Sequence, residues 1–365
     1  MTAHGVPFMT LEPGEDRVAI DEAIRRVVDR GRFVLGPELE AFEAEFAAAC
    51  GTEHAIGVGN GTDAIGLVLQ ALGIRPGDEV ITTPLSAAYT VLAVMMAGAR
   101  PVFADIDPNR LTLNPDAVEA AVGPKTAAIL PVHIYGQPAD MVALAGVAGR
   151  HHLALVEDCC QAHFATAAGR PVGTFGAAGA FSFYPTKNLG ALGDAGAVVT
   201  SNGPLAEKLK RLRNGGQLDR YVHVEAGRNS RLDEIQAAIL RARLPLLAAW
   251  TERRRALAAV YRRELAGAPV SVPPECDRGH VYHLFPVRAR ERERLQAHLS
   301  ACGIETLIHY PIPIPRQPLL AGASTDECPV ADSVCAEVLS LPLHHKVPER
   351  DVLKVTAAIR SFGRT

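Results

Sequence analysis

From residue 55 onward, short apolar runs alternate with stretches whose apolar positions recur at helical spacing. The runs lie at residues 55–58, 79–82, 101–105, 127–132, 153–157, 180–183 and 196–200. Strands that alternate with helices of about 10 to 15 residues are typical of a mostly parallel sheet with helices on both faces. The sequence therefore predicts an α/β fold. Ligands of such sheets bind beyond the carboxyl ends of the strands.

The segments on either side of this core have other patterns. Apolar positions between charges predict an amphipathic helix over residues 16–30, and a second helix follows Gly36 and Pro37. After a boundary near 245–265, the sequence predicts a different set of elements: a strand at 283–288, a helix at 290–302, a proline-rich loop at 308–315 and a closing helix from Glu349. We expect a large domain over residues 1–245 and a smaller C-terminal α+β domain over residues 246–365.

Composition narrows the possible partners and the compartment. The formal net charge of −3 argues against a nucleic-acid partner. Seven cysteines, including the adjacent pair Cys159 and Cys160, do not form a disulfide framework, and the N-terminal residues have no apolar secretory core. Both features favour the cytoplasm. The uncharged stretch 80–99 is interrupted by Pro84 and several hydroxyl residues, so we expect a buried strand end, a loop and a helix rather than a membrane span.

A lysine follows the apolar run that begins at Ala180. Pro185 ends the run, and Lys187 lies in a turn bounded by Gly190 and Gly193. An amine beside a buried strand loses hydration, so its pKa falls and it becomes able to form a Schiff base with a carbonyl group. The alternative is a lysine on the surface of a loop, which is its more common location.

A second candidate is the glycine-rich stretch that precedes the helix starting near Ala64. Gly61 and Thr62 would offer free backbone N–H groups to a phosphate at the helix start. A dinucleotide fingerprint fails here, because Thr62 occupies its third glycine position. Simple helix capping by Thr62 or Asp63 is the alternative.

Polar side chains also follow the apolar run at 153–157. The carboxyl end of this run carries Glu157 and Asp158, and Gln161 follows shortly after it. Asp158 is either a turn or cap residue or the partner of a buried cation, such as a protonated ring nitrogen. Farther along the chain, Ser230 and Asp233 match a capping box.

Together these groups match the contacts that pyridoxal 5'-phosphate needs: Lys187 for the aldehyde, Asp158 for the pyridine nitrogen and a cradle for the phosphate. One helix N-terminus contributes only about 0.3–1 kcal/mol, so several donors must converge on the phosphate. We expect Ser182 and Asn229 to join Gly61 and Thr62.

Four motifs carry a resemblance to a known family. They are Asn60-Gly61-Thr62-Asp63-Ala64, Glu157-Asp158-x-x-Gln161-Ala162-His163, the stretch from Ser182 to Gly190, and the stretch from Asn229 to Glu234. The chain resembles the sugar aminotransferases of the DegT/DnrJ/EryC1/StrS family over nearly its whole length. The resemblance implies a type I aminotransferase fold and a homodimer with active sites at the subunit interface.

The resemblance also implies roles for individual residues. Lys187 would be the Schiff-base lysine and later the proton carrier, Asp158 would meet the pyridine nitrogen, and Gln161 would meet the ring hydroxyl. The phosphate would be held by Thr62, by Ser182 and by the partner subunit's Asn229. Tyr89 is the candidate for the aromatic residue that stacks on the cofactor ring.

The implied reaction is transamination of a ketosugar, with glutamate as the expected amino donor. The segments 281–285 and 306–313 are similar to those of members that aminate C3 of a nucleotide-linked 3-keto-6-deoxyhexose. Arg231, His309 and Tyr310 would then contact the sugar or its diphosphate, although loop packing would equally explain His309 and Tyr310. The alternatives are a C4 ketosugar, a ketocyclitol of the scyllo-inosose type, and a regulator that holds the cofactor without turnover.

Overall fold

A seven-stranded sheet forms the centre of the molecule. The structure, a computed structural model, describes residues 5–321 and 327–363. Within this part, the strand order is β1-β9-β8-β5-β4-β2-β3, and β9 alone runs antiparallel to its neighbours. The strands are β1 (His54–Val58), β2 (Glu79–Thr82), β3 (Arg100–Phe103), β4 (Thr126–Leu130), β5 (Ala154–Asp158), β8 (Ala178–Ser182) and β9 (Gly196–Thr200). The expected α/β fold with a mostly parallel sheet is confirmed.

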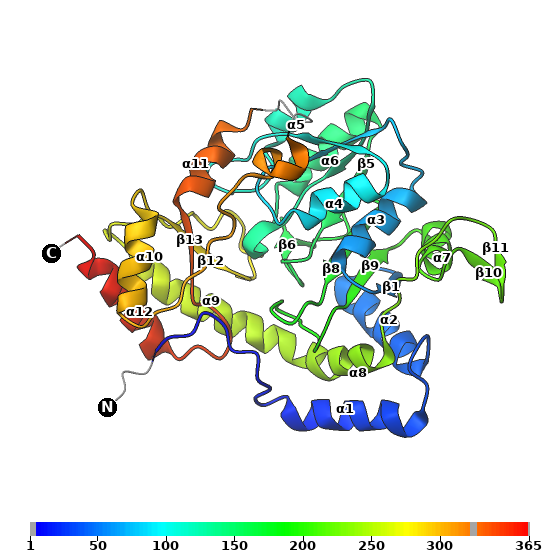
Figure 1. The fold of residues 1–365 in the computed structure, drawn as a ribbon, viewed down its shortest axis with the longest axis horizontal. Helices are drawn as coiled ribbons and strands as arrows, with labels where there is room; N and C mark the ends of the chain where they lie inside the picture. The colour runs from blue at the N-terminus through cyan, green and yellow to red at the C-terminus, as the bar shows by residue number, and fades with distance from the viewer. Residues whose placement is uncertain (1–4, 322–326, 364–365) are drawn as a thin grey trace.

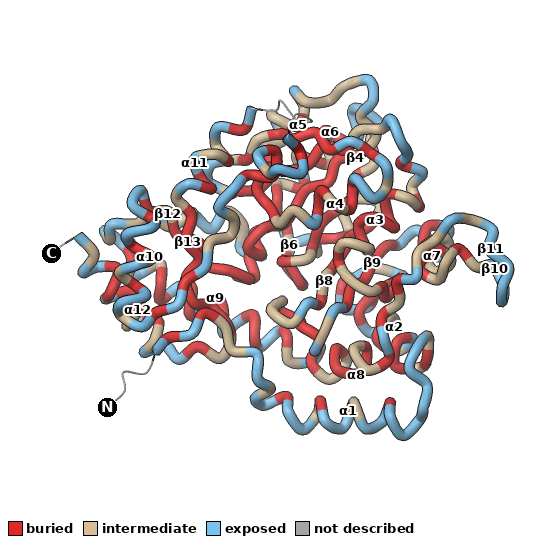
Figure 2. Tube along the Cα trace, viewed as in Figure 1, coloured by how far each residue is buried: buried red, intermediate tan, exposed pale blue. Residues whose placement is uncertain are grey.

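Helices cover both faces of this sheet, as Figure 1 shows. One face packs against α2 (Pro37–Cys50), α5 (Pro115–Ala121), α6 (Met141–His151) and α8 (Glu234–Arg243). The other face packs against α3 (Gly61–Ala71), α4 (Tyr89–Met96) and α7 (Gly203–Leu212). Successive strand residues point to opposite faces of the sheet, as Leu155 and Val156 of β5 do. The strands are therefore covered on both sides, which explains their continuous apolar runs, and Figure 2 shows most of the sheet in the colour of buried residues.

A second core lies at the other end of the molecule. The antiparallel pair β12 (Phe285–Arg288) and β13 (Val338–Leu341) packs there with α10 (Arg292–Ala301) and α12 (Glu349–Ser361). The long helix α9 (Leu247–Glu264) links the two cores, because Leu247 packs in the first and Leu257 in the second. Val6 also belongs to the second core. The domain boundary at 245 stays a prediction, and the packing changes gradually along α9.

Several local predictions need correction. Asn60, rather than Thr62 or Asp63, caps α3, since its Oδ1 accepts a hydrogen bond of 2.8 Å from Asp63 N. Ser230 does not cap α8, which begins only at Glu234. Its hydroxyl instead accepts from Gly59 N at 3.0 Å and donates to Asp63 at 2.7 Å. These partners come from a distant segment, so local spacing could not reveal them.

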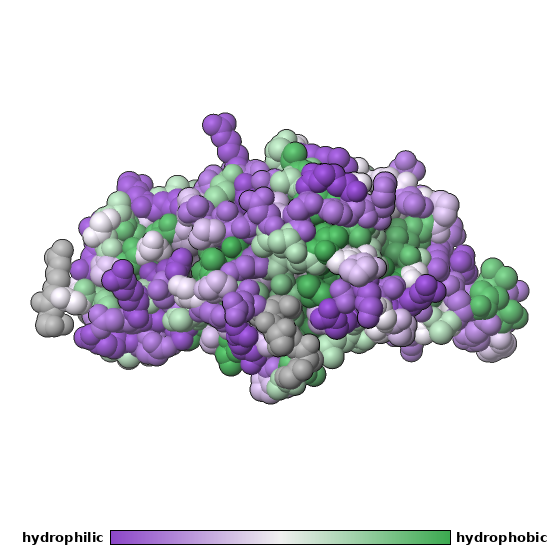
Figure 3. All heavy atoms as spheres, turned by 90° about the horizontal axis from the view of Figure 1, so that it is seen from above, coloured by the Kyte–Doolittle hydropathy of each residue, from purple (hydrophilic) through white to green (hydrophobic). Residues whose placement is uncertain are grey.

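Other elements lie at the edges of the molecule. Helix α1 (Arg17–Arg30) ends at Gly31 as predicted, and α11 (Pro329–Glu337) precedes β13. A hairpin of β10 (Gln217–Asp219) and β11 (Val222–His223) extends from the body, and hydrophobic atoms are visible on this protrusion in Figure 3. In the described residues we find no helix whose length and apolar character would allow it to cross a bilayer.

Candidate active site

The start of α3 forms a cradle of free amides. No hydrogen bond engages the N–H groups of Gly61 and Thr62 among the described residues, while Asn60 caps the next amide. A Cβ atom at Gly61 would lie 2.7 Å from Cys160 Sγ and 2.8 Å from the Cβ of Ser182. Only glycine fits this position without displacing its neighbours. The cradle therefore directly adjoins the ends of β5 and β8, and its amides are suited to an anion.

Asp158 is held in a fixed orientation at the end of β5. It is 4% exposed, and its two carboxylate oxygens accept from different donors. Thr90 Oγ1 of α4 donates to Oδ2 at 2.8 Å, and Cys160 N donates to Oδ1 at 3.1 Å. Sequence reasoning missed Thr90. The available signal was that hydroxyl residues interrupt the apolar stretch from Val80 to Ala99.

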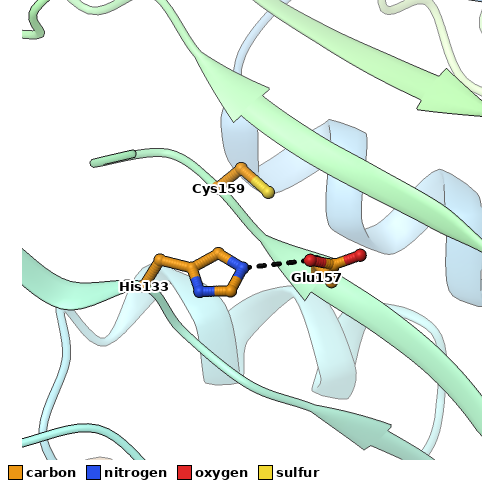
Figure 4. A group of neighbouring side chains, drawn as sticks. All are labelled: His133, Glu157 and Cys159. Atoms are coloured by element: carbon orange, nitrogen blue, oxygen red, sulfur yellow. Dashed lines mark hydrogen bonds and ion pairs between the residues drawn. The ribbon is translucent and has the colours of Figure 1, made fainter. Parts of the chain in front are cut away.

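Glu157 points to the opposite face of the strand, because neighbouring side chains alternate. Its carboxylate accepts from His133 Nε2 at 3.2 Å, and from the backbone N–H groups of Gly173, Phe175 and Gly176. Figure 4 shows His133 and Glu157 beside Cys159, a group with the spacing of metal ligands. However, His133 Nδ1 already accepts from Ala139 N at 3.0 Å. Both ring nitrogens are thus engaged, and the group acts as a buried anchor for the 173–176 turn.

Lys187 lies half-buried in the turn after β8. Its backbone N–H donates to Tyr184 O at 2.8 Å. Its amine makes no hydrogen bond or ion pair among the described residues, whereas Asp158 and Cys160 act on it electrostatically. Burial lowers the pKa of Lys187, and the charges of Cys160 and Asp158 oppose this shift. The structure thus brings together the lysine, the aspartate and the cradle, although they are far apart in the sequence.

The charge of this amine acts on three histidines. Burial and, second, the charge of Lys187 lower the pKa of His163 to about 3, that of His309 to about 4, and that of His283 well below its usual value. His163 Nε2 donates to Ser182 O at 2.9 Å, which fixes the end of β8. The imidazoles therefore stay neutral and add no positive charge beside the lysine.

Gln161 and Tyr310 form another wall of the site. Gln161 Oε1 accepts from Tyr135 N at 2.6 Å, and its amide donates to Tyr310 Oη at 3.3 Å. Burial raises the pKa of Tyr310 to about 12, with smaller contributions from Asp158 and from Tyr89. Tyr89 is the first residue of α4 and is 65% exposed. These electrostatic contributions indicate that Tyr89 lies near the site.

His309 has contacts that suit both of its proposed roles. Its Nδ1 lies 3.0 Å from Ser340 Oγ, and its ring stacks on Phe8 with centroids 5.8 Å apart. The side chain is therefore partly a packing residue. It still acts electrostatically with Lys187, so it also borders the site.

No hydrogen bond or ion pair among the described residues joins Asn229 or Arg231 to Lys187 or Asp158. Asn229 is exposed and its backbone pairs with Asn214, whose Oδ1 accepts from Arg231 Nη1 at 3.0 Å. Ser230, between them, is bound to the start of α3. The segment is thus fixed beside the cradle, while the Asn229 side chain is free to meet another molecule.

Several known proteins are similar to this chain in sequence and in structure. A transaminase of Streptomyces venezuelae, named for dTDP-3-amino-3,4,6-trideoxy-alpha-D-glucose, is 50% identical over 98% of this chain and 96% of its own length. The erythromycin biosynthesis sensory transduction protein EryC1 of Saccharopolyspora erythraea is also 50% identical, over 93% of this chain and 94% of its own. The crystal structure of DesV from S. venezuelae, in complex with a ketimine intermediate, has a TM-score of 0.96, with 49% identity over 99% of both chains.

The match to a family model covers almost the whole described chain, residues 15–360. It includes the cradle, the Asp158 strand end and the Lys187 turn. Aminotransferases of this family depend on pyridoxal 5'-phosphate, which confirms the cofactor expected from the sequence. The chain belongs to the DegT/DnrJ/EryC1/StrS aminotransferase family.

Proposed function

We propose that this enzyme transfers an amino group from glutamate to a nucleotide-linked 3-keto-6-deoxyhexose, in the biosynthesis of a deoxyaminosugar. The observation that carries the catalytic part is the half-buried amine of Lys187, free of hydrogen bonds and next to Asp158. The sugar is inferred from the near full-length similarity to a transaminase named for a dTDP-3-amino sugar. The similarity of segments 281–285 and 306–313 to C3-acting members supports the same substrate.

The described residues fit pyridoxal 5'-phosphate. The unpartnered amides of Gly61 and Thr62 would hold its phosphate together with Ser182, and the fixed carboxylate of Asp158 would hold its ring nitrogen. Gln161 would meet the ring hydroxyl, and Tyr89 is the candidate for stacking on the ring. When bound, this cofactor supplies an electron sink for the substrate carbon next to nitrogen.

Lys187 is the residue that we assign to proton movement. Burial lowers the pKa of its amine and thus makes a neutral, nucleophilic form available. The pKa values of the nearby histidines are lowered, so these rings stay neutral and add no positive charge beside the amine. We assign Arg231, His309 and Tyr310 to the sugar or its diphosphate, with Arg231 suited to bidentate phosphate contact.

A homodimer with shared active sites is part of this proposal. The hairpin β10–β11 exposes several apolar side chains: Leu218, Tyr221, Val222 and Val224. Exposed apolar side chains gathered on a protrusion are suited to burial against a second copy. The neighbouring Asn229 would then reach the phosphate in the other subunit. We also infer a reducing cytoplasm, since no disulfide joins any of the seven cysteines in the described structure.

Amination of a TDP-linked 3-keto-6-deoxyhexose and of scyllo-inosose, each with glutamate, tests the substrate. We expect the nucleotide sugar to be aminated at C3, as NMR of the product would show. A preference for the cyclitol, or amination at C4, would contradict the proposal.

A regulatory role is favoured by one observation, the name of the sensory transduction relative. Glutamate should shift the cofactor's absorbance band if the first half-reaction proceeds. An unmoved band would support the non-catalytic role. We favour catalysis because Lys187 and Asp158 are both present and adjacent.

A further inference from the structure

The carboxylate of Asp63 joins the start of α3 to a segment far along the chain. Its Oδ2 accepts from Ser230 Oγ at 2.7 Å, and its Oδ1 accepts from Arg228 Nη1 at 3.2 Å. These two partners lie on either side of Asn229 in the sequence. An aspartate in the first turn of a helix ordinarily compensates the positive end of the helix dipole. Such a role does not explain why each oxygen is engaged by the 228–230 segment.

The same segment holds the cradle from both sides. Ser230 is 3% exposed, and its hydroxyl also accepts from Gly59 N at 3.0 Å. Ser230 is therefore bound to Gly59 before the cradle and to Asp63 after it. The free amides of Gly61 and Thr62 lie between these two points. The position of both amides thus depends on the contact between α3 and the 228–230 segment.

Arg228 extends this contact to α4. Its Nη2 donates to Met96 O, at the end of α4, at 3.2 Å. The guanidinium lies directly on α3, because a Cβ atom at Gly66 would be only 2.8 Å from Nη1. Helix α4 begins with Tyr89 and Thr90, which are the candidate for ring stacking and the donor to the cofactor-binding aspartate. Arg228 therefore connects both helices of the cofactor site to one segment.

Asn229 lies between two fixed residues. Arg228 N donates to Leu212 O at 2.7 Å, and Ser230 N donates to Arg213 O at 2.9 Å. Since neighbouring side chains of an extended stretch alternate, and those of Arg228 and Ser230 both reach α3, the side chain of Asn229 is directed away from it. Helix α7 packs on α3 at the end of the molecule where the hairpin β10–β11 extends in Figure 1.

The charge of Asp63 by itself does not favour a phosphate. A carboxylate in the first helical turn repels an anion that is bound at the same helix start. The ion pair with Arg228 offsets part of this repulsion. A carboxylate that only compensates the helix and a carboxylate that positions the cradle therefore predict opposite effects on phosphate affinity when the charge is removed.

We propose that Asp63 is a positioning residue for two phosphate sites at once. It fixes the cradle of its own subunit and, through Arg228 and Ser230, it fixes Asn229, which reaches the phosphate site of the partner subunit. Asp63 itself touches neither the cofactor nor the sugar. The inference rests on the homodimer and the role of Asn229 in the proposed function, but it is independent of which sugar is the substrate.

Two ligands that differ only in the phosphate test the first half of this inference. Asp63→Asn keeps the size of the side chain but replaces one acceptor oxygen with an amide, so that Arg228 or Ser230 loses its partner. The cofactor-free variant is titrated with pyridoxal 5'-phosphate and, separately, with pyridoxal. We expect a roughly tenfold loss of affinity for pyridoxal 5'-phosphate, as for one hydrogen bond to a charged group. The affinity for pyridoxal should be nearly unchanged.

Three results would overturn the positioning role. An equal loss for both ligands would indicate a general structural defect, and an unchanged affinity would show that the cradle needs no support from Asp63. A gain for pyridoxal 5'-phosphate would show that the carboxylate acts only by repulsion. The matched control is Asp21→Asn on α1, at a 55% exposed carboxylate that is paired with Arg17 at 2.7 Å. It should bind both ligands as the unmodified enzyme does.

Ser230→Ala is a second variant, which keeps the test informative if Asp63→Asn does not fold. It removes the hydroxyl that joins Gly59 to Asp63 but leaves the ion pair between Asp63 and Arg228. It should also weaken the binding of pyridoxal 5'-phosphate, by a smaller factor, and leave that of pyridoxal nearly unchanged. Normal affinity for pyridoxal 5'-phosphate in Ser230→Ala would contradict the link through Ser230.

Mixed dimers test the second half. Dimers of one Asp63→Asn subunit and one unmodified subunit are purified by a tag on one of them. One site then has the altered cradle, and the other receives Asn229 from the altered subunit. We expect both sites to bind pyridoxal 5'-phosphate more weakly than in the unmodified dimer. If one site keeps its normal affinity, Asp63 acts only on its own cradle and the second half is wrong.

These outcomes are distinct from a failure of the proposed function. The titrations contain neither sugar nor amino donor, so a wrong substrate would not change them. Native mass spectrometry determines whether the chain is a dimer. A monomer would refute the homodimer and, with it, the second half of the inference, whereas the comparison of pyridoxal 5'-phosphate with pyridoxal would still decide the first half.

Discussion

Thr90 Oγ1 donates a hydrogen bond of 2.8 Å to Oδ2 of Asp158, and thereby joins the start of α4 to the end of β5. Thr90 is itself 3% exposed, so water cannot easily replace it. The carboxylate is thus oriented before any ligand arrives. Such preorganisation favours binding because less ordering remains to be done.

The first prediction concerns this hydrogen bond. Thr90→Val keeps the branched shape but removes the donor. It should weaken cofactor binding by about tenfold or more, since a hydrogen bond to a charged group contributes roughly 1.5–3 kcal/mol. Absorbance titration of the cofactor-free enzyme with pyridoxal 5'-phosphate measures this affinity. Thr90→Ser retains the hydroxyl and should bind nearly normally; equal affinity of the valine variant would show that Asp158 needs no such support.

The second prediction concerns Lys187. Lys187→Ala should remove the absorbance band of lysine-bound cofactor and reduce turnover by about three orders of magnitude or more, in the range of lost general acid–base catalysis. Spectra and turnover with glutamate check both effects. Lys210→Ala, which removes a lysine paired with Glu207 on the surface of α7, is the matched control. Retained turnover in Lys187→Ala would refute the assigned role.

A third prediction follows from His280, which is 5% exposed and accepts from Tyr282 N at Nδ1. Burial, with the positive charge of Arg262 second, lowers the pKa of His280 from 6.5 to about 3. Between these two pKa values, His280 of the unfolded chain therefore binds a proton, whereas His280 of the folded protein stays neutral. Stability should fall as the pH drops from about 6 to about 4, by roughly 1.4 kcal/mol per pH unit for this group.

Denaturant unfolding at several pH values tests this contribution. His280→Asn keeps an acceptor for Tyr282 N but does not titrate, so its stability curve should be flatter in this range. A curve parallel to that of the unmodified enzyme would mean that His280 is not the source of the acid sensitivity.

A fourth prediction addresses the shared active site. Lys187→Ala and Asn229→Ala homodimers should each have low activity. Mixing them with subunit exchange should restore about one quarter of the unmodified activity, because about half of the dimers are then mixed and each has one intact site. Turnover after mixing is the measurement. If activity does not recover although exchange is shown by mass spectrometry, Asn229 does not serve the neighbouring subunit.

The final prediction concerns the anchor around Glu157. Glu157→Gln places an amide where four donors converge, so at least one donor loses its partner. We expect a loss of about 1–3 kcal/mol in the free energy of unfolding. Denaturant midpoints measure it. Glu119→Gln, at a half-exposed carboxylate bound to Arg150, should leave the denaturant midpoint nearly unchanged, as surface substitutions usually do; an equally small effect at Glu157 would contradict the anchor role.

Local pattern was sufficient for most elements. The apolar runs predicted the sheet, and β9 spans the predicted residues 196–200. The turn after β8 was also predicted, because Pro185 and the following glycines impose it locally. Some predicted bounds were less accurate, because the end of a strand depends on its pairing partner. The run predicted at 180–183 is β8, which stops at Ser182, where its pairing with Gly196 ends.

The sequence alone therefore determined the fold class, the strand ends that carry Asp158 and Ser182, and the turn that carries Lys187. These depend on periodicity and turn chemistry, which act over a few neighbouring residues. Only the tertiary structure decided that Thr90 holds Asp158 and that Ser230 binds Asp63. Such contacts join segments separated by whole crossover connections. No local rule fixes them, because they depend on how the sheet orders its strands.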